Sequence, residues 1–235
     1  MKVSVIIPAL DEAENIEACL ASVTRQEGDF EIIVVDGGSR DRTVEIAQSY
    51  AHTVTSERGR GRQMNAGARL ATGDALLFLH ADSELHPGAL AGLRASLADG
   101  FTVGGTFTLK FDSDRLPLRA YAFFTRFKPR AFHYGDQGIF VRRSVYDKLE
   151  GFKETPLMED VDFLKRLRKL GRVALINLPV TTSARRFLKH GPVRQQLRNL
   201  ILVSLYGLGV KPETLARWYQ TNRDREPSAP FTESS

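Results

Sequence analysis

The chain has 235 residues, 42% of them hydrophobic and 26% charged, which suits one α/β domain of the larger kind, alone or with an extension. Its single cysteine, Cys19, excludes an internal disulfide and a zinc site built from several cysteines. The sequence has no recognisable secretory leader and no apolar run long enough to span a bilayer, so a reducing cytoplasm is the expected compartment.

The formal net charge of +5 is divided unevenly along the chain. Residues 1–100 hold 9 Lys and Arg against 15 Asp and Glu, a net charge of −6. Residues 101–235 hold the remaining 24 basic and 13 acidic residues, a net charge of +11. A basic half of this kind favours phosphate-bearing partners, such as nucleic acid, lipid head groups or phosphorylated metabolites, over a surface that is merely solvated.

The first half of the chain alternates short apolar runs with segments of helical periodicity. Strands are predicted over residues 3–7, 31–35, 54–55 and 75–79. Helices are predicted over residues 12–26 and about 63–71. Between them, Ser39 or Asp41 can cap another predicted helix, which runs through Val44, Ile46 and Ala47. This β-α-β-α-β-α-β order implies a parallel sheet with right-handed crossovers.

The second half of the chain is less regular. Helices are predicted over residues 87–97, 118–127, 142–149, 158–170 and 193–208. Strands are predicted over residues 102–111, 138–141 and 173–176, the first with a β-bulge because glycines interrupt its alternation. The tail over residues 223–235 is polar, contains two prolines and is predicted to be disordered.

Polar side chains follow three of the predicted strands at the point where each strand ends. Asp11 and Glu12 follow the first strand, Asp36 follows the second, and His80 and Asp82 follow the fourth. Open α/β sheets bind their ligands at the carboxyl ends of the strands. His80 and Asp82, two residues apart, would point the same way, which suits a divalent metal that carries a diphosphate. A solvated loop is the alternative for these two residues.

Two common nucleotide-binding motifs are missing. No G-x-G-x-x-G follows the first strand, which argues against a dinucleotide site of the Rossmann type. No G-x-x-x-x-G-K-[ST] is present, which argues against a P-loop. The segment over residues 36–39, Asp-Gly-Gly-Ser, still leaves backbone room for a ligand at close range.

Three segments resemble the motifs of the family 2 glycosyltransferases with the GT-A fold. Residues 5–12 resemble the family's strand followed by Pro-x-x-[Asn/Asp]-Glu, and residues 34–43 resemble its Val-Asp-x-x-Ser-x-Asp-x-Thr. Residues 78–82 resemble its Asp-x-Asp metal motif, with His80 in place of the first Asp. Residues 135–138 and 158–160, with Arg166, resemble later motifs. The likeness covers about residues 1–190, and the small bacterial subgroup labelled radical-SAM/selenodomain-associated transferase 2 is the most similar.

This resemblance implies an α/β GT-A fold, with a mostly parallel central sheet flanked by helices. Residues 1–190 would form the glycosyltransferase domain, with a nucleotide-sugar half over residues 1–100 and an acceptor half over residues 101–190. Residues 191–222 would form a C-terminal helical extension.

The activity implied by the resemblance is that of an inverting, metal-dependent hexosyltransferase. A sugar would pass from a UDP- or GDP-linked donor to a hydroxyl acceptor in a single displacement, and the acceptor would be lipid-linked or a small metabolite. The cofactor would be Mn²⁺ or Mg²⁺, held by Asp82. His80 would contact the ribose or a metal-bound water, with direct ligation that favours Mn²⁺ and a packing role as alternatives.

The resemblance also implies a set of residues for the nucleotide-sugar donor. Asp36 would accept a hydrogen bond from a base N–H, and Arg58 and Arg62 would neutralise phosphate oxygens, with a flexible basic loop as the alternative for the arginines. The whole donor set is Pro8, Ala9, Leu10, Glu12, Asp36, Gly38, Ser39, Arg58, Arg62, Gln63, Asn65, His80, Ala81 and Asp82.

Catalytic residues are expected at the start of the predicted helix over residues 158–170. Asp160 would be the general base that takes the acceptor's proton, and Glu159 would bind the acceptor or support the fold. The alternative is that both acids only complement the helix dipole.

Four further polar residues are expected at the acceptor or the diphosphate. Asp136 and Gln137 would bind acceptor hydroxyls or the donor sugar, with a turn-forming role as the alternative. Arg185 and Arg186 would close over the leaving diphosphate. The histidines other than His80 are expected to be structural or exposed. Some related enzymes take a third metal ligand from the C-terminal half, and His133 and His190 are the two candidates for that role here.

Membrane contact and two rival functions complete the expectations. The segment over residues 123–132 interleaves aromatic and basic residues, and would lie on an anionic membrane at the inner face, cover the acceptor or pack in the core.

A nucleotidyltransferase would carry a glycine-rich basic loop after the first strand, and residues 8–12 do not form such a loop. A nucleic-acid-binding module would use the basic half, but convergent acids argue against it, so no nucleic-acid partner is expected.

Overall fold

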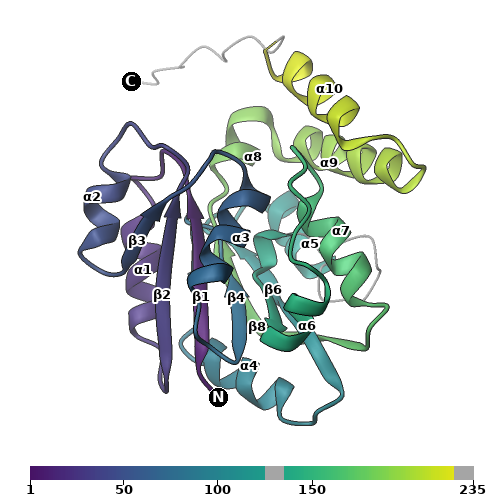
Figure 1. Cartoon of the computed structure of the whole chain (residues 1–235). Coiled ribbons are helices and arrows are strands. Elements are labelled where there is room, and N and C mark those ends of the chain that lie inside the picture. Colours follow the sequence, from purple (N-terminus) through teal and green to yellow (C-terminus); the bar gives the residue numbers. More distant parts are fainter. Residues whose placement is uncertain (125–134, 225–235) are drawn as a thin grey trace.

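The computed structural model describes residues 1–124 and 135–224, and these residues form an eight-stranded sheet with helices on both faces (Figure 1). The strand order is β3-β2-β1-β4-β7-β6-β8-β5. The predicted alternation of strands and helices in the first half is confirmed, with the bounds β1 (Val3–Ala9), α1 (Ile16–Thr24), β2 (Phe30–Asp36), α2 (Thr43–Gln48), β3 (His52–Thr55), α3 (Arg60–Leu70) and β4 (Ala75–Phe78).

The strands β3, β2, β1 and β4 are parallel neighbours, as the sequence predicts. Along β1, alternate side chains pack on opposite faces of the sheet. Val5 and Ile7 belong to the hydrophobic cluster that includes α1 and α4, whereas Ile6 belongs to the cluster that includes α3 and α7. All three are fully buried, because helices cover both faces of this part of the sheet.

The second half of the chain completes the sheet with mixed strand directions. Its elements are β5 (Ser83–Leu85), α4 (Ala89–Leu97), β6 (Thr102–Phe111), α5 (Leu116–Phe124), η1 (Gly135–Gln137), β7 (Ile139–Arg142), α6 (Arg143–Lys148), α7 (Glu159–Leu167), β8 (Arg172–Thr182), α8 (Arg185–His190), α9 (Pro192–Gly207) and α10 (Pro212–Asp224). β7 is antiparallel to β4 and β6, and β5 is antiparallel to β8. The sheet is therefore parallel at one end and mixed at the other.

Several predicted boundaries in the second half are wrong or incomplete. β8 extends to Thr182, whereas the prediction stopped at residue 176, because the ladder with β6 continues through a register shift that includes Pro179. The predicted irregularity of β6 is confirmed by that same shift at Phe107 and Thr108. The sequence did not predict β5, α8 or α10. Part of the segment over residues 123–132, and residues 225–235 of the predicted disordered tail, lie outside the described residues.

The helix predicted over residues 12–26 begins only at Ile16, because the preceding residues bind the neighbouring loop. The backbone N–H of Glu12 donates to Thr43 Oγ1 at 2.8 Å, and the N–H of Ala13 donates to Asp41 at 3.0 Å. The N–H of Asp11 donates to Ser39 Oγ at 2.9 Å. These hydrogen bonds tie the loop after β1 to the loop after β2.

The register of the parallel strands brings their carboxyl ends to one edge. Ala9 of β1 is paired with Asp36 of β2, and the N–H of Leu79, just after β4, donates to Ile6 at 3.0 Å. The helices α8, α9 and α10 lie beyond this edge (Figure 1). None of the helices within residues 1–124 and 135–224 has the length and apolar character needed to cross a bilayer.

Candidate active site

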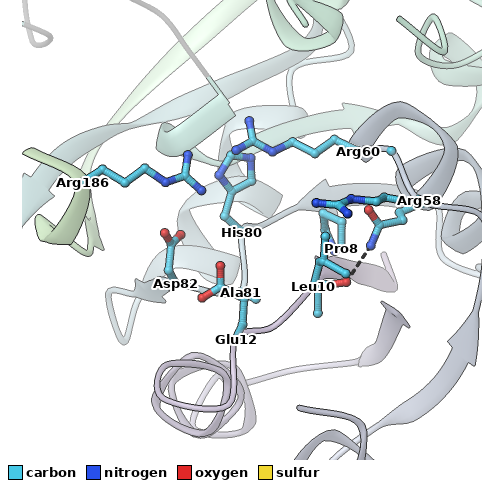
Figure 2. Close-up of a pocket in the computed structure, with 12 residues that line it drawn as sticks. Pro8, Leu10, Glu12, Arg58, Arg60, His80, Ala81, Asp82 and Arg186 are labelled. Atoms are coloured by element: carbon cyan, nitrogen blue, oxygen red, sulfur yellow. Dashed lines mark hydrogen bonds between the residues drawn. The ribbon is translucent and has the colours of Figure 1, made fainter. Parts of the chain in front are cut away.

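A cavity of about 250 Å³ opens at the carboxyl edge of the parallel strands, and we call it the strand-edge cavity (Figure 2). Its lining comes from the loops after β1 and β4, the start of α3, and α8. The lining residues are Pro8, Ala9, Leu10, Glu12, Arg58, Gly59, Arg60, Gln63, His80, Ala81, Asp82 and Arg186. All of them except Gly59 and Arg60 are residues that the sequence predicted for the site.

A second and larger cavity, of about 420 Å³, lies beside it and is called the helix cavity. Arg58, Arg60 and Arg186 line both cavities, so the two spaces meet at three arginines. The predicted catalytic residues Glu159 and Asp160 line the helix cavity. Asp136 lines it as well. The rest of the wall combines apolar and polar side chains from the loop before α7 and from α7, α8, α9 and α10: Pro156, Leu157, Met158, Val161, Phe187, Gln195, Asn199, Leu202, Val203 and Tyr219.

Two carboxylates from separate loops share one arginine beside the strand-edge cavity. Arg185 Nη2 donates to the Glu12 carboxylate, at 2.5 Å from Oε2, and lies 3.8 Å from Asp82 Oδ2. The Glu12 and Asp82 side chains are each 12% exposed. Burial of Arg185 opposes its charge, but the two carboxylates outweigh this effect and raise its pKa above the ordinary value. Carboxylates that converge at this edge therefore need a neighbouring cation to offset the cost of burying their charge.

His80 is held by Asp136 of η1. His80 Nδ1 lies 3.2 Å from Asp136 Oδ1, and the His80 side chain is 13% exposed. Burial would raise the pKa of Asp136, but the hydrogen bond and charge of His80, followed by Arg60 and Arg186, hold it well below its usual range. Because an ionised carboxylate can only accept, Nδ1 is the donor, and Nε2 is the His80 nitrogen left for a ribose or a metal.

Arg60 is the functional candidate that sequence reasoning missed. Figure 2 shows Arg60 and Arg186 entering from opposite sides with their guanidinium groups directed toward His80. Arg60 Nη1 lies 3.8 Å from Glu159 Oε1. Desolvation opposes the charge of Arg60, but Glu159 and, more weakly, the neighbouring aspartates outweigh it, so its pKa is raised.

The predicted residue Arg62 points elsewhere. Its guanidinium pairs with Glu57 and, at 3.2 Å, with Glu154, and it does not line either cavity. Since α3 begins at Arg60, one half-turn of helix separates Arg60 from Arg62 and sends their side chains in different directions. Three arginines alternate in this segment, and Arg58 and Arg60 are the two that line the cavities. The sequence could have singled them out only if the first residue of α3 had been known.

Two other predicted donor residues have structural partners. Gln63 Nε2 donates to the carbonyl oxygens of Ala9 and Val35, at 2.8 Å each, so it holds the ends of β1 and β2 while it lines the strand-edge cavity. Asn65 Oδ1 accepts from Tyr146 Oη at 2.7 Å, and its Nδ2 donates to the Phe152 carbonyl at 2.9 Å. Asn65 lines neither cavity, and its predicted contact with the donor stays a prediction.

The loop after β2 uses its own polar groups internally. Asp36 is buried, and its Oδ2 accepts from the backbone N–H of Gly38 at 2.8 Å and of Ser39 at 3.0 Å. Gly38 has φ +92°, a conformation that favours glycine. None of these three residues lines the strand-edge cavity, so a contact between Asp36 and the base stays a prediction. Such a contact would use a lone pair of the Asp36 carboxylate that the loop's own N–H groups do not occupy.

Glu159 and Asp160 open α7 side by side but in different surroundings. Glu159 is buried against Arg60, and its pKa is raised by desolvation and by the charge of Asp160, with Arg60 acting in the opposite sense. Asp160 is only partly buried, and its Oδ1 accepts from the N–H of Val161 at 2.7 Å. The more accessible Asp160 is thus the carboxylate with better access to a bound molecule in the helix cavity. Gln137 is buried next to Asp136 and lines neither cavity.

Asp82 is the residue predicted to hold a divalent metal. Within the described parts of the chain, no three His, Cys, Asp or Glu side chains are placed to hold a metal ion together. A single carboxylate still fits a hard cation whose other ligands are water and substrate phosphates. His133 lies outside the described residues, and nothing is described of the side chain of His190.

Comparisons with known proteins agree with this geometry. The family model described as "Glycosyl transferase family 2" matches residues 4–150. The "PGL/p-HBAD biosynthesis glycosyltransferase" of Mycobacterium bovis is 45% identical over 92 residues, which are 35% of this chain and 36% of that protein. "Glycosyltransferase AglE" of Haloferax volcanii is 34% identical over 134 residues, which are 47% of this chain and 44% of that protein. The chain therefore matches less than half of the length of these relatives.

Solved structures are similar over most of the chain. The mannosyltransferase PcManGT from Pyrobaculum calidifontis, in complex with GDP-Man and Mn²⁺, has a TM-score of 0.67 at 20% identity, over 97% of this chain and 66% of that one. Glucosyl-3-phosphoglycerate synthase from Mycobacterium tuberculosis, with Mn²⁺, UDP and its product, has a TM-score of 0.64 at 20% identity, over 89% and 81%. These similarities confirm the predicted GT-A fold. Because the family model matches more than half of its residues, this chain belongs to glycosyl transferase family 2.

Proposed function

We propose that this chain transfers a sugar from a UDP- or GDP-linked donor to a hydroxyl acceptor. The donor diphosphate occupies the strand-edge cavity, and the acceptor occupies the helix cavity. The observation that carries this proposal is the junction of the two cavities at Arg58, Arg60 and Arg186. A bond that is exchanged between donor and acceptor must lie where their sites meet, and the departing diphosphate needs cations at that point.

The arginines of the junction bind and stabilise the leaving group. Guanidinium groups pair with phosphate oxygens in bidentate geometry, and their attraction increases as negative charge grows on the departing diphosphate. Proteins of similar fold that were solved with UDP, UDP-GlcNAc and GDP-Man support the proposal of a nucleoside-diphosphate donor for this chain.

Asp82 is the residue that would hold Mn²⁺ or Mg²⁺ in this proposal. The ion, when bound, supplies additional positive charge to the diphosphate oxygens. Arg185, which lies 3.8 Å from Asp82, would then be held by Glu12, with which it is already paired. His80, fixed by Asp136 through Nδ1, presents its other ring nitrogen to the donor.

Asp160 acts as the general base. It takes the proton of the acceptor hydroxyl, whose oxygen attacks C1 of the sugar from the face opposite the diphosphate. The new C–O bond forms as the bond from C1 to the diphosphate oxygen breaks, and that bonding pair leaves with the diphosphate. A single displacement of this kind inverts the configuration at C1 and needs no covalent enzyme intermediate. Glu159, buried beside Arg60, keeps that arginine at the junction.

The acceptor and the wider context also belong to this proposal. Apolar walls in the helix cavity support an acceptor with an apolar part, either lipid-linked or a small metabolite. α9 and α10 contribute Leu202, Val203 and Tyr219 to that cavity, so the proposed extension over residues 191–222 takes part in the acceptor site. The assignment to the radical-SAM/selenodomain-associated subgroup and a cytoplasmic location, at the inner face of the membrane, rest on the sequence alone.

Calorimetric titration with UDP, GDP and CDP, each with Mn²⁺ and again with EDTA, tests the proposal. Uracil and guanine each carry a ring N–H that a carboxylate such as Asp36 can accept, and neutral cytosine carries none. We expect UDP or GDP with Mn²⁺ to bind about tenfold more tightly than CDP. Tightest binding of CDP would contradict the role of Asp36, and no binding of any of the three would contradict the proposed donor class.

A further inference from the structure

The outer side of α9 carries a stripe of exposed apolar side chains. Val193, Leu197 and Ile201 follow one another at intervals of four residues, and their exposed fractions are 61%, 55% and 46%. Residues four apart lie on the same side of a helix. On the other side, Leu202 is buried and lines the helix cavity. The buried residues of α9 are Gln195, Arg198 and Leu202. α9 therefore exposes an apolar stripe while two of its three buried residues are polar, which is the reverse of an ordinary surface helix.

An apolar groove continues this stripe. It has a volume of about 170 Å³ and lies between α5, α8 and the start of α9, where Leu118, Phe187 and Val193 contribute to its wall. Leu116 of α5 and Leu188 of α8 are also exposed, and both helices contribute to the groove. We call the stripe and the groove together the α9 surface. Exposed apolar area of this extent on neighbouring elements indicates a binding surface rather than scattered exposure.

The segment that contains α8 and α9 carries charge of one sign. Residues 183–212 contain no Asp or Glu, and they contain six Lys or Arg. Lys189, Arg194 and Lys211 of this segment are exposed. Exposed apolar side chains together with exposed basic residues on one segment match a surface that is apolar inside and anionic at its boundary.

We propose that the α9 surface docks on an anionic lipid bilayer. Val193, Leu197 and Ile201 enter the boundary between head groups and acyl chains, and the basic residues meet anionic head groups. Charge decides between this partner and a second copy of the chain. A two-fold contact through the same surface would place two acid-free basic segments against each other, which is electrostatically unfavourable.

The position of the α9 surface suits an acceptor that reaches the enzyme from a membrane. Phe187 lines both the apolar groove and the helix cavity, so one side chain separates the docking surface from the proposed acceptor site. This last step rests on the proposed function, whereas the docking itself does not.

Co-sedimentation of the full chain with vesicles tests the docking. We expect binding to phosphatidylcholine vesicles that contain phosphatidylglycerol, and much weaker binding to vesicles of phosphatidylcholine alone. The double variant Leu197→Glu/Ile201→Glu should bind the anionic vesicles about tenfold less, because it replaces apolar contacts with repelled charges. The matched control is Leu70→Glu, since Leu70 is 45% exposed on α3, away from this surface. Circular dichroism and UDP titration check that both variants are folded and that the donor site is intact.

Three outcomes would overturn the proposal. The first is no binding of the wild-type chain to anionic vesicles, and the second is equal loss of binding in the Leu70→Glu control. The third is a dimer, detected by light scattering, that the double variant dissociates while vesicle binding is unaffected. Failure of both UDP and GDP to bind, with intact vesicle binding, would instead contradict the proposed donor class and leave the docking surface supported.

Discussion

The two cavities that meet at Arg58, Arg60 and Arg186 are formed by different kinds of structural element. The strand-edge cavity is formed mainly by loops at the ends of parallel strands, and hydrogen bonds such as that from Gln63 to Ala9 and Val35 hold those ends in place. The helix cavity is larger, and side chains of α7, α8, α9 and α10 form much of its wall. One site is thus a polar edge braced by the sheet, and the other is a partly apolar space between helices.

Within the proposed mechanism, this difference separates the departure of the diphosphate from the choice of acceptor. A braced polar edge suits a ligand part that is always the same, such as a diphosphate. A space between helices can change its shape by substitution of Leu202 or Val203 without any change at the sheet edge. Variants on the two sides should therefore have separable effects on donor binding and on transfer.

The largest effect is expected from Asp160→Asn. The amide keeps the shape of the side chain but cannot take a proton at neutral pH, so the transfer rate should fall by roughly 10²–10⁴-fold. Donor affinity should be nearly unchanged, because Asp160 lines the helix cavity and not the strand-edge cavity. Transfer kinetics and UDP calorimetry measure the two quantities, with Asp147→Asn, an exposed acid on α6, as the control. Near wild-type transfer in Asp160→Asn would move the role of base to Glu159 or Asp136.

On the other side of the junction, Asp82→Ala should remove the Mn²⁺ dependence of donor binding. The loss of the ion's charge on the leaving group should lower the transfer rate by about 10²-fold or more. The fold should persist, since Arg185 keeps Glu12 as its partner. Calorimetry with and without Mn²⁺ is the measurement, and Glu84→Ala, an exposed acid two residues further on, is the matched control. Unchanged turnover with Mn²⁺ in Asp82→Ala would remove the metal assignment.

A substitution at the junction should affect both sides together. Arg60→Gln removes a cation that lines both cavities, and the transfer rate should fall by about 10²-fold, with weaker UDP binding as well. Arg62→Gln should change neither quantity, because Arg62 pairs with Glu57 and Glu154 outside both cavities. Equal effects of the two substitutions would show that the arginines act only through the general positive field.

The contrast between the cavities also explains what the sequence could predict. Residues of the strand-edge cavity lie directly after apolar runs, so Glu12, His80 and Asp82 could be placed at one edge from local patterns and the rule for parallel strands. Arg60 was missed because its direction depends on the residue at which α3 begins. The helix cavity brings Asp160 of α7 together with Leu202 of α9, and no local pattern encodes such a contact between separate helices.

The smallest effect is expected from Glu159→Gln, and it is an effect on stability as a function of pH. Desolvation and the charge of Asp160 raise the pKa of Glu159 in the folded chain above its ordinary value. A carboxyl whose folded pKa lies above its unfolded pKa binds more protons when folded, so it makes folding less favourable as the pH rises above the unfolded value. Glutamine has no such titration. The variant should therefore lose less stability than the wild type between the unfolded pKa and neutral pH, as measured by urea unfolding across that range. If the variant is instead less stable at neutral pH, the attraction between Glu159 and Arg60, whose charged atoms lie 3.8 Å apart, contributes more to stability than burial of the Glu159 charge costs.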